Sequence, residues 1–162
     1  MPETILVTGA SGFVAAHVIL AFLTAGYHVR GSVRLQSAAE SIKSRYPQYS
    51  QQLSLVIVPD IAVPGAFNYA LVSVSGVIHT ASPFVLDVSD NENDLLQPAI
   101  RGTLNIAHTI HTCNPSVRRL VVTSSFAAVL NLDQGFRPTY RYSEADWNPC
   151  SYEIARKPPT RA

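Results

Sequence analysis

A glycine-rich turn near the start of the chain has the residue types that bind phosphate. Gly9 and Gly12 follow the apolar run Ile5-Leu6-Val7, and a helical pattern begins directly after them. Glycines between a strand and a helix let the backbone approach a pyrophosphate, and the N–H groups of the helix N-terminus favour its negative charge. The spacing is G-x-x-G-x-x-A, ending at Ala15, and differs from the standard G-x-G-x-x-G. On the glycines alone, an ordinary tight turn stays an open alternative.

The residue at the end of the next strand-like run distinguishes two forms of dinucleotide. Where NAD is bound, an acidic residue about 20 positions beyond the turn bonds the ribose hydroxyls. This chain has no acidic residue between Glu3 and Glu40, and Arg34 stands at the expected strand end. A guanidinium can hold a 2′-phosphate through two parallel charge-assisted hydrogen bonds. The pattern favours NADP(H), with a solvated strand-end charge as the alternative for Arg34, whereas Arg30 is expected to be an ordinary surface residue.

Alternating strands and helices must position these residues. Continuous apolar runs, typical of strands covered on both faces, predict strands over residues 4–8, 27–33, 53–58, 76–80 and 119–124. Helical spacing predicts helices over 12–25, 37–46, 64–72 and 92–113. This alternation indicates right-handed βαβ units, so the predicted fold class is α/β with a doubly wound parallel sheet.

Two of the predicted helices carry further signals. Ser37 and Glu40 have the spacing of a capping box, which places the start of the second helix at Ser37. Pro98 is expected in the first turns of the long helix or at a bend in it. The expected apolar positions of the long helix are Leu95, Ile100, Leu104, Ile106 and Ile110.

Composition and charge exclude several classes of function. The chain has 162 residues, with 12 Lys and Arg against 11 Asp and Glu, and shows no basic stripe that would favour nucleic acid. Cys113 and Cys150 form no metal motif and the five His are scattered, so we expect no bound metal. The longest apolar run, Phe13 to Leu23, is too short to cross a bilayer. Without a basic signal segment, we expect a cytoplasmic protein with no membrane partner.

Seven segments along the chain form a longer pattern. They are Thr8–Val14 with His17, Gly31–Arg34, Val58–Ile61, His79–Phe84, Pro98–Ile100 with Gly102 and Thr103, Val121–Ser125 with Ala127, Ala128 and Val129, and Trp147–Pro149. In this order and spacing the chain resembles the extended short-chain dehydrogenase/reductases of the NAD-dependent epimerase/dehydratase superfamily. It is most similar to the branch that holds dihydroflavonol reductases and fungal aldehyde/ketone reductases of the methylglyoxal type.

The resemblance implies a Rossmann fold of about five strands in the order 3-2-1-4-5. It implies an NADP(H)-binding domain over residues 1–150 and an irregular or disordered tail over 151–162, with the C-terminal half of the family fold missing. The long helix near 92–113 is the surface through which a homodimer would form. We expect the last residues to be frayed, because Pro158 and Pro159 cannot continue a helix.

The resemblance also implies roles for individual residues at the carboxyl ends of the strands, where ligands of such sheets bind. The pyrophosphate would be wrapped by Gly9, Ser11, Gly12, Phe13 and Val14, and the 2′-phosphate would be held by Arg34. The adenine would be bordered by Asp60 and Ile61. The nicotinamide ribose would be lined by Thr80, Ala81 and Ser82, and the nicotinamide would lie beside Thr123 and Ser124. Ser125 would be the catalytic serine on the substrate carbonyl, and Phe84 would face the substrate. Simpler roles stay open: Asp60 could cap a turn, and the serines could be loop or strand-end hydroxyls.

Carbonyl reduction in this family needs a tyrosine as general acid and a lysine four residues later, and Y-x-x-x-K is absent from the sequence. Tyr152 with Arg156 is the nearest match, but an arginine fork differs from a compact ammonium. We therefore expect the cofactor-binding portion of an NADPH-dependent reductase of ketones or aldehydes, truncated before its catalytic pair and inactive alone. The alternatives are a non-catalytic NADP(H)-binding module and an inactive truncated paralogue.

Overall fold

The computed structural model describes residues 2–82, 88–135 and 137–157, which form two compact units. The first unit comprises Met1–Pro83 and Pro98–Thr123, and the second comprises Phe84–Gln97 and Ser124–Ala162. The functional division that we predicted at residue 150 stays a prediction. Phe84 and the last five residues, with the predicted fraying, lie outside the described residues.

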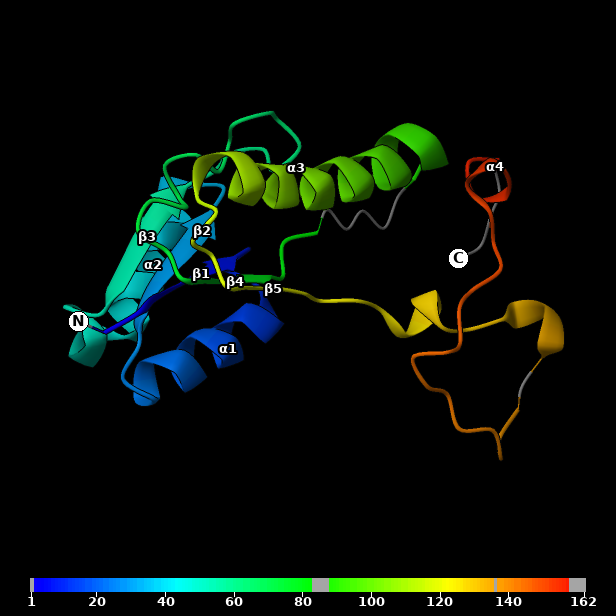
Figure 1. Ribbon diagram of the computed structural model, residues 1–162, viewed down its shortest axis with the longest axis horizontal. Helices are drawn as coiled ribbons and strands as arrows, with labels where there is room; N and C mark the ends of the chain where they lie inside the picture. Colours follow the sequence, from blue (N-terminus) through cyan, green and yellow to red (C-terminus); the bar gives the residue numbers. More distant parts are fainter. Residues whose placement is uncertain (1, 83–87, 136, 158–162) are drawn as a thin grey trace. The chain divides into compact units, whose positions relative to one another are not determined.

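A parallel sheet is the centre of the first unit (Figure 1). Its strands are β1 (Thr4–Thr8), β2 (His28–Val33), β3 (Leu53–Ile57), β4 (Gly76–His79) and β5 (Arg119–Val122). They pair in parallel in the order β3-β2-β1-β4-β5, which confirms the predicted fold class and strand order. All carboxyl ends therefore lie at one edge, where the candidate residues of the sequence are expected to meet.

Helices cover both faces of the sheet (Figure 1). Helices α1 (Phe13–Thr24) and α2 (Gln36–Arg45) pack on one face against alternate strand residues such as Val7 and Val29. Helix α3 (Gln97–Cys113) belongs to the other face, where Ile106 joins Leu6 and Val77 in a second core. Burial on both faces explains the continuous apolar run of β1, whereas Arg119, Val121 and Val122 of β5 are exposed.

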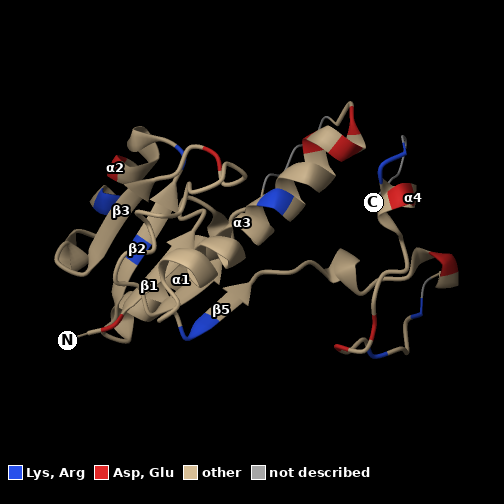
Figure 2. Cartoon of the chain, turned by 45° about the horizontal axis from the view of Figure 1, so that its top comes forward, with Lys and Arg blue, Asp and Glu red and all other residues tan. Residues whose placement is uncertain are grey.

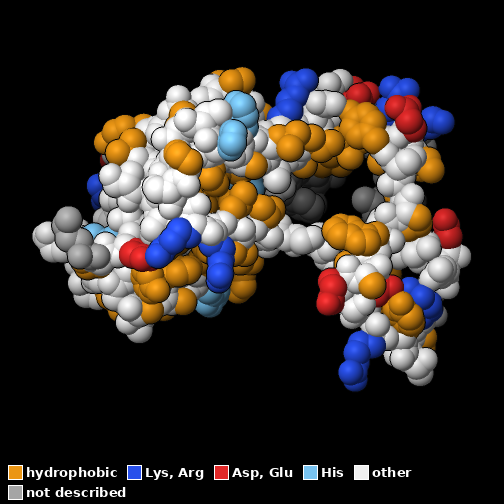
Figure 3. Space-filling view, viewed as in Figure 1, with side chains coloured by type: hydrophobic (Ala, Val, Ile, Leu, Met, Phe, Trp, Pro, Cys, Tyr) orange, Lys and Arg blue, Asp and Glu red, His pale blue; other side chains and the backbone are white. Residues whose placement is uncertain are grey.

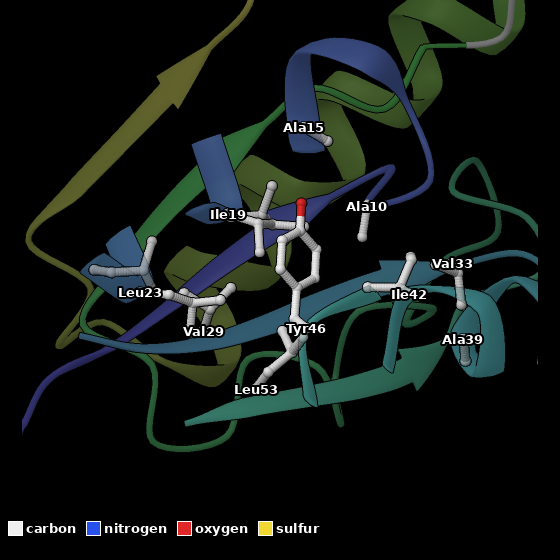
Figure 4. Packing of buried hydrophobic residues seen from close by; sticks show 12 residues of the cluster. Ala10, Ala15, Ile19, Leu23, Val29, Val33, Ala39, Ile42, Tyr46 and Leu53 are labelled. Carbon is white, nitrogen blue, oxygen red and sulfur yellow. The ribbon is translucent and has the colours of Figure 1, made fainter. Parts of the chain in front are cut away.

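Tyr46, directly after α2, lies in the centre of the first core. Its ring stands among Ile19, Val29 and Leu53 (Figure 4). Its hydroxyl donates to the carbonyl oxygen of Ala16 at 3.2 Å, so the polar end of the ring is paired with helix α1. This contact ties α2 and the following 3-10 turn Pro47–Tyr49 to α1.

Two helix predictions were wrong in detail. The residue before α2 is Leu35, with no side-chain cap, and Ser37 lies inside the helix instead of capping it. Glu40 accepts a hydrogen bond from the Gln36 side chain at 3.1 Å, so the capping-box carboxylate is used within the helix. The predicted helix over 64–72 is a series of turns, because Gly65 and Ser73 both have positive φ and interrupt helical geometry.

The long helix differs from its prediction in its first turns and its exposed face. Residues Asn91–Leu96 form a π-helix that leads directly into α3, where Pro98 is the second residue. A proline lacks the N–H for a regular helical bond, which fits a change of helix type at this point. Ile106 is fully buried, but Ile100 and Leu104 are 40% and 63% exposed, so the predicted apolar face is only partly covered.

The second unit consists of short elements joined by extended segments. They are the π-helix Asn91–Leu96, the 3-10 turns Phe126–Ala128 and Leu132–Gln134, and α4 (Tyr152–Ala155). Figure 2 shows that several residues of the π-helix are Asp or Glu. The side chain of its N-cap, Asp90, accepts from the backbone N–H groups of Glu92 and Asn93. Hydrophobic side chains appear on the surface of both units (Figure 3). In the second unit, Trp147 and Phe126 are 73% and 67% exposed.

Candidate nucleotide-binding site

The glycine turn has a backbone that only glycine adopts easily. Gly9 has a φ of +65°, and its carbonyl oxygen accepts from the Gly12 N–H at 2.9 Å. A Cβ at Gly9 would lie 2.9 Å from the Cα of Ala81, so the backbone after β4 approaches the turn directly. Both features require a residue without a side chain at position 9, as close approach of the backbone to a phosphate group also does.

Helix α1 begins with an open N-terminus. Its N-cap is Gly12, no side chain caps it, and no acidic residue lies in its first turn. The first N–H groups of a helix have no partner within the helix and carry partial positive charge. Ser11, Phe13 and Val14 are exposed there, with the Phe13 ring 82% exposed and against the His17 ring at 4.9 Å. The arrangement can bind an anion.

The turn is fixed against strand β2. The Ala10 N–H donates to the Ser32 carbonyl oxygen at 2.8 Å. A Cβ at Gly31 would lie 2.8 Å from the Ala10 Cβ, so the missing side chain at Gly31 is what lets the turn lie on β2. Gly31 belongs to the segment Gly31–Arg34 on which the family resemblance was based, and this close contact explains why a glycine stands there.

The two arginines of the β2 region have different environments. Arg34 follows β2, is exposed, and makes no hydrogen bond or ion pair with any residue that the structure describes. Arg30 is half-buried and donates from Nη1 to the carbonyl oxygens of Ala70 at 2.9 Å and Val72 at 2.6 Å. The prediction that Arg30 is an ordinary surface residue was therefore wrong, since it ties the turns after β3 to the sheet.

The segment after β3 holds the residues predicted beside the adenine. The Val58 N–H donates to the Val33 carbonyl oxygen at 2.8 Å, which places this segment next to the strand end that carries Arg34. Asp60 is exposed, and its Oδ1 accepts from the Ala62 N–H at 2.8 Å. The turn-capping role left open for Asp60 is thus present, and its second carboxylate oxygen has no hydrogen bond to a described residue. Ile61 is half-buried.

A buried network joins the carboxyl ends of β1 and β4. The Thr8 hydroxyl oxygen accepts from the N–H groups of Thr80 and Ala81, both at 3.1 Å, and lies 2.8 Å from His79 Nδ1. Because that oxygen already accepts twice, we assign its proton to a bond with Nδ1, which puts the ring proton of His79 on Nε2. The Thr80 hydroxyl donates to the Thr8 carbonyl oxygen. Burial lowers the pKa of His79 and keeps its ring neutral.

The residues at the end of β5 divide between the two units. The Thr123 N–H donates to the His79 carbonyl oxygen at 3.0 Å and continues the ladder with β4. Ser124 and Ser125 belong to the second unit, where the Ser125 hydroxyl oxygen accepts from the Ala127 N–H at 3.2 Å and caps a 3-10 turn. Ser82 is exposed at the end of the described segment after β4.

Tyr152 is engaged by acidic and amide side chains of the π-helix region. Its hydroxyl donates to Glu92 Oε1 at 2.7 Å and accepts from Gln97 Nε2. The Glu92 carboxylate raises the pKa of Tyr152 above its ordinary value of 10.0. Arg156 bonds Glu153 at 2.8 Å and lies 3.8 Å from Glu92, and its charge lowers the pKa of Tyr152 by less than the Glu92 carboxylate raises it. A general acid for reduction needs a pKa nearer to the working pH.

Sequence reasoning missed the side chains that act through backbone contacts. The side chains of Thr8 and of the α3 residue Asn105 bond backbone groups beside the candidate site, and His79 bonds the Thr8 hydroxyl. A polar Asn105 between the apolar neighbours Leu104 and Ile106 is the one signal that the sequence offered. Among the described residues no group of His, Cys, Asp and Glu could hold a metal ion, and no helix is long and apolar enough to cross a membrane.

Several known proteins are similar in sequence to nearly the whole of this chain. The chain is 42% identical over 154 residues to the uncharacterized oxidoreductase C513.07 of Schizosaccharomyces pombe, covering 94% of this chain and 46% of the relative. It is 36% identical over 164 residues to the NADPH-dependent methylglyoxal reductase GRE2 of Saccharomyces cerevisiae, covering 98% and 48%. The chain thus spans about half the length of the curated relatives that it matches.

Solved structures of two reductases also superpose on nearly the whole of this chain. The yeast methylglyoxal/isovaleraldehyde reductase Gre2 complexed with NADPH superposes with a TM-score of 0.88 at 36% identity, over 95% of this chain and 46% of that one. Vestitone reductase from alfalfa superposes with a TM-score of 0.72 at 26% identity, over 90% of this chain and 42% of that one. Residues 5–152 match the NAD dependent epimerase/dehydratase family. Because the parallel sheet and the glycine turn agree with this match, the chain belongs to that family.

Proposed function

We propose that the chain binds NADP(H) at the carboxyl edge of its sheet, as the cofactor-binding portion of a reductase that converts ketones or aldehydes to alcohols. The observation that carries the proposal is Arg34, which stands exposed at the end of β2 where NAD-binding folds place an acid. The NADPH-dependent methylglyoxal reductase of yeast, 36% identical, supports the choice of cofactor and reaction class.

The residues present fit the proposed ligand. The open N-terminus of α1 and the side-chain-free turn at Gly9 suit a pyrophosphate, and no acid in the first turn of α1 repels it. Arg34 is available for the 2′-phosphate, and Asp60 has a carboxylate oxygen available for the adenine amino group. When bound, the reduced nicotinamide supplies hydride to a carbonyl carbon; in this chain Ser125 would hydrogen-bond the carbonyl oxygen.

The proton for the product alcohol would come from a group outside this chain. Y-x-x-x-K is absent from the 162 residues, and Tyr152 has its hydroxyl bonded to Glu92 with a raised pKa. The same observation favours a second candidate function, a non-catalytic NADP(H)-binding module. Neither candidate predicts turnover by this chain alone, so reduction of methylglyoxal with NADPH by the 162 residues would contradict both.

Calorimetric titration with NADPH and NADH tests the cofactor. We expect the chain to prefer NADPH, and we expect Arg34→Gln to weaken NADPH binding by about 10- to 100-fold, as loss of hydrogen bonds to a charged group predicts, with little change for NADH. Arg45→Gln is the matched control, because Arg45 is an exposed arginine in the last turn of α2. Absence of NADPH binding, or equal losses in both variants, contradicts the proposal.

A further inference from the structure

Helix α3 holds the segment that follows β3 through one amide side chain. Asn105 Nδ2 donates to the carbonyl oxygens of Ile61 at 2.8 Å and Val63 at 2.7 Å. Both amide protons are therefore used on backbone oxygens of a segment more than 40 residues earlier in the chain. Each such bond fixes a carbonyl that would otherwise be free to rotate, so Asn105 sets the path of the chain through Ile61.

A glycine one turn earlier on α3 provides the seat for the Ile61 side chain. Gly102 is buried, and a Cβ built on it would lie 2.6 Å from Ile61 Cδ1 and 2.9 Å from Ile61 Cγ1. These separations are far below normal carbon–carbon contact, so a larger residue would displace the side chain. Gly102 and Asn105, three residues apart on a helix, thus meet Ile61 from one face of α3.

The other side of the same segment is fixed by strand β2. Val58 N–H bonds the carbonyl oxygen of Val33, the residue before Arg34. Between these two attachments the chain forms the Asp60 turn, closed by the bond from the Ala62 N–H to Asp60 Oδ1. The position of the Asp60 carboxylate relative to the end of β2 therefore depends on an attachment to β2 and on one to α3.

We infer that Asn105 and Gly102 are positioning residues for the adenine end of the NADP(H) site. They act through Ile61 and Asp60, and the inference rests on the proposed function of these two residues. Neither Asn105 nor Gly102 has to touch the nucleotide. The surface that they set is the one that receives the adenine ring, next to the strand end that carries Arg34.

The chain offers a matched control at the other end of the same loop. Asn114 Nδ2 donates to the carbonyl oxygens of Leu71 at 2.7 Å and Val74 at 2.9 Å, so it makes the same two kinds of bond away from Ile61. Asn105→Ala and Asn114→Ala each remove two hydrogen bonds to backbone carbonyls. They differ in whether the affected carbonyls lie beside the predicted adenine position.

The test is calorimetric binding of NADPH and of adenosine 2′,5′-bisphosphate, with urea unfolding measured for every variant. We expect Asn105→Ala to weaken binding of both ligands about tenfold, whereas Asn114→Ala changes it by less than about twofold although it also lowers stability. Asn105→Asp keeps the shape but cannot donate, so it should behave like Asn105→Ala. Gly102→Ala leaves Asn105 intact and should give the same loss by displacing Ile61.

The outcomes distinguish this inference from the function on which it rests. If the unchanged chain fails to bind NADPH, the proposed function and the inference are both overturned. If the unchanged chain binds and the Asn105 and Asn114 variants lose equally, or neither loses, the inference alone is overturned. Should Asn105→Ala fail to fold, Gly102→Ala and Asn105→Asp give the same decision.

Discussion

The Gly9→Ala substitution should be among the most damaging single changes in the turn, for two separable reasons. Gly9 has a φ of +65°, a left-handed conformation that costs an alanine about 1–2 kcal/mol. The added Cβ would also lie 2.9 Å from the Ala81 Cα, which is backbone and cannot rotate away. Overpacking of this kind costs about 1–3 kcal/mol, so the free energy of unfolding should fall by about 2–5 kcal/mol in all.

Gly26→Ala isolates the first of these two causes. Gly26 follows α1 with a φ of +86°, and nothing lies within 4 Å of a Cβ built on it. Both substitutions reduce the freedom of the unfolded chain equally, so this contribution cancels in the comparison. Gly9→Ala should therefore be more destabilising than Gly26→Ala by about 1–3 kcal/mol, the cost of the contact with Ala81 alone.

Urea unfolding followed by circular dichroism gives both free energies, and calorimetry gives the NADPH dissociation constants. We expect Gly9→Ala to weaken NADPH binding at least about tenfold, because relief of the contact moves the turn away from the pyrophosphate position. Gly26→Ala should bind within about twofold of the unchanged chain, since the turn after α1 is remote from the site. Equal destabilisation by the two substitutions would refute the reasoning from the Ala81 contact.

Two further predictions concern the titrating groups. The folded pKa of His79 lies below its unfolded value of 6.5, so around and below pH 6.5 the unfolded chain binds more protons than the folded chain. The free energy of unfolding should therefore fall as the pH drops below 6.5. Urea unfolding at pH 5.5 and 7.5 measures this fall, which should be smaller in His79→Asn than in the unchanged chain. An unchanged difference would contradict the neutral assignment of His79. Tyr152→Phe removes the bonds to Glu92 and Gln97, so it should lower the stability of the second unit and leave NADPH affinity unaltered. Turnover by the unchanged chain that Tyr152→Phe abolishes would identify Tyr152 as an acid after all.

The sheet could be predicted from the sequence because its signals are local. Each strand is a short apolar run bounded by turn residues, and the predicted strands end within two residues of the observed ones. The positions of Gly9 and Arg34 relative to these strand ends followed from the same runs. The parallel order followed from the alternation of strands with helices and from the resemblance to the family.

The segment 64–72 shows what the sequence could not reveal. Its apolar residues Phe67, Ala70 and Leu71 have helical spacing and are buried. Its carbonyl oxygens, however, are bonded to Arg30 and Asn114 from distant elements instead of forming a helical ladder. Long-range bonds of this kind leave no periodic signal, and the positioning role of Asn105 was missed for the same reason.

Strand β5 has a consequence for how copies of this chain meet in solution. Among the described strands none lies beyond β5, so its outer backbone groups form an open edge, with Val121 and Val122 each more than 40% exposed. An open apolar edge is a template for pairing with another chain. Arg119 is the first residue of β5, so parallel in-register pairing of two such edges would place Arg119 against Arg119. Charge at one end of the strand thus disfavours a parallel pair of edges and leaves an antiparallel pair as the less repulsive encounter.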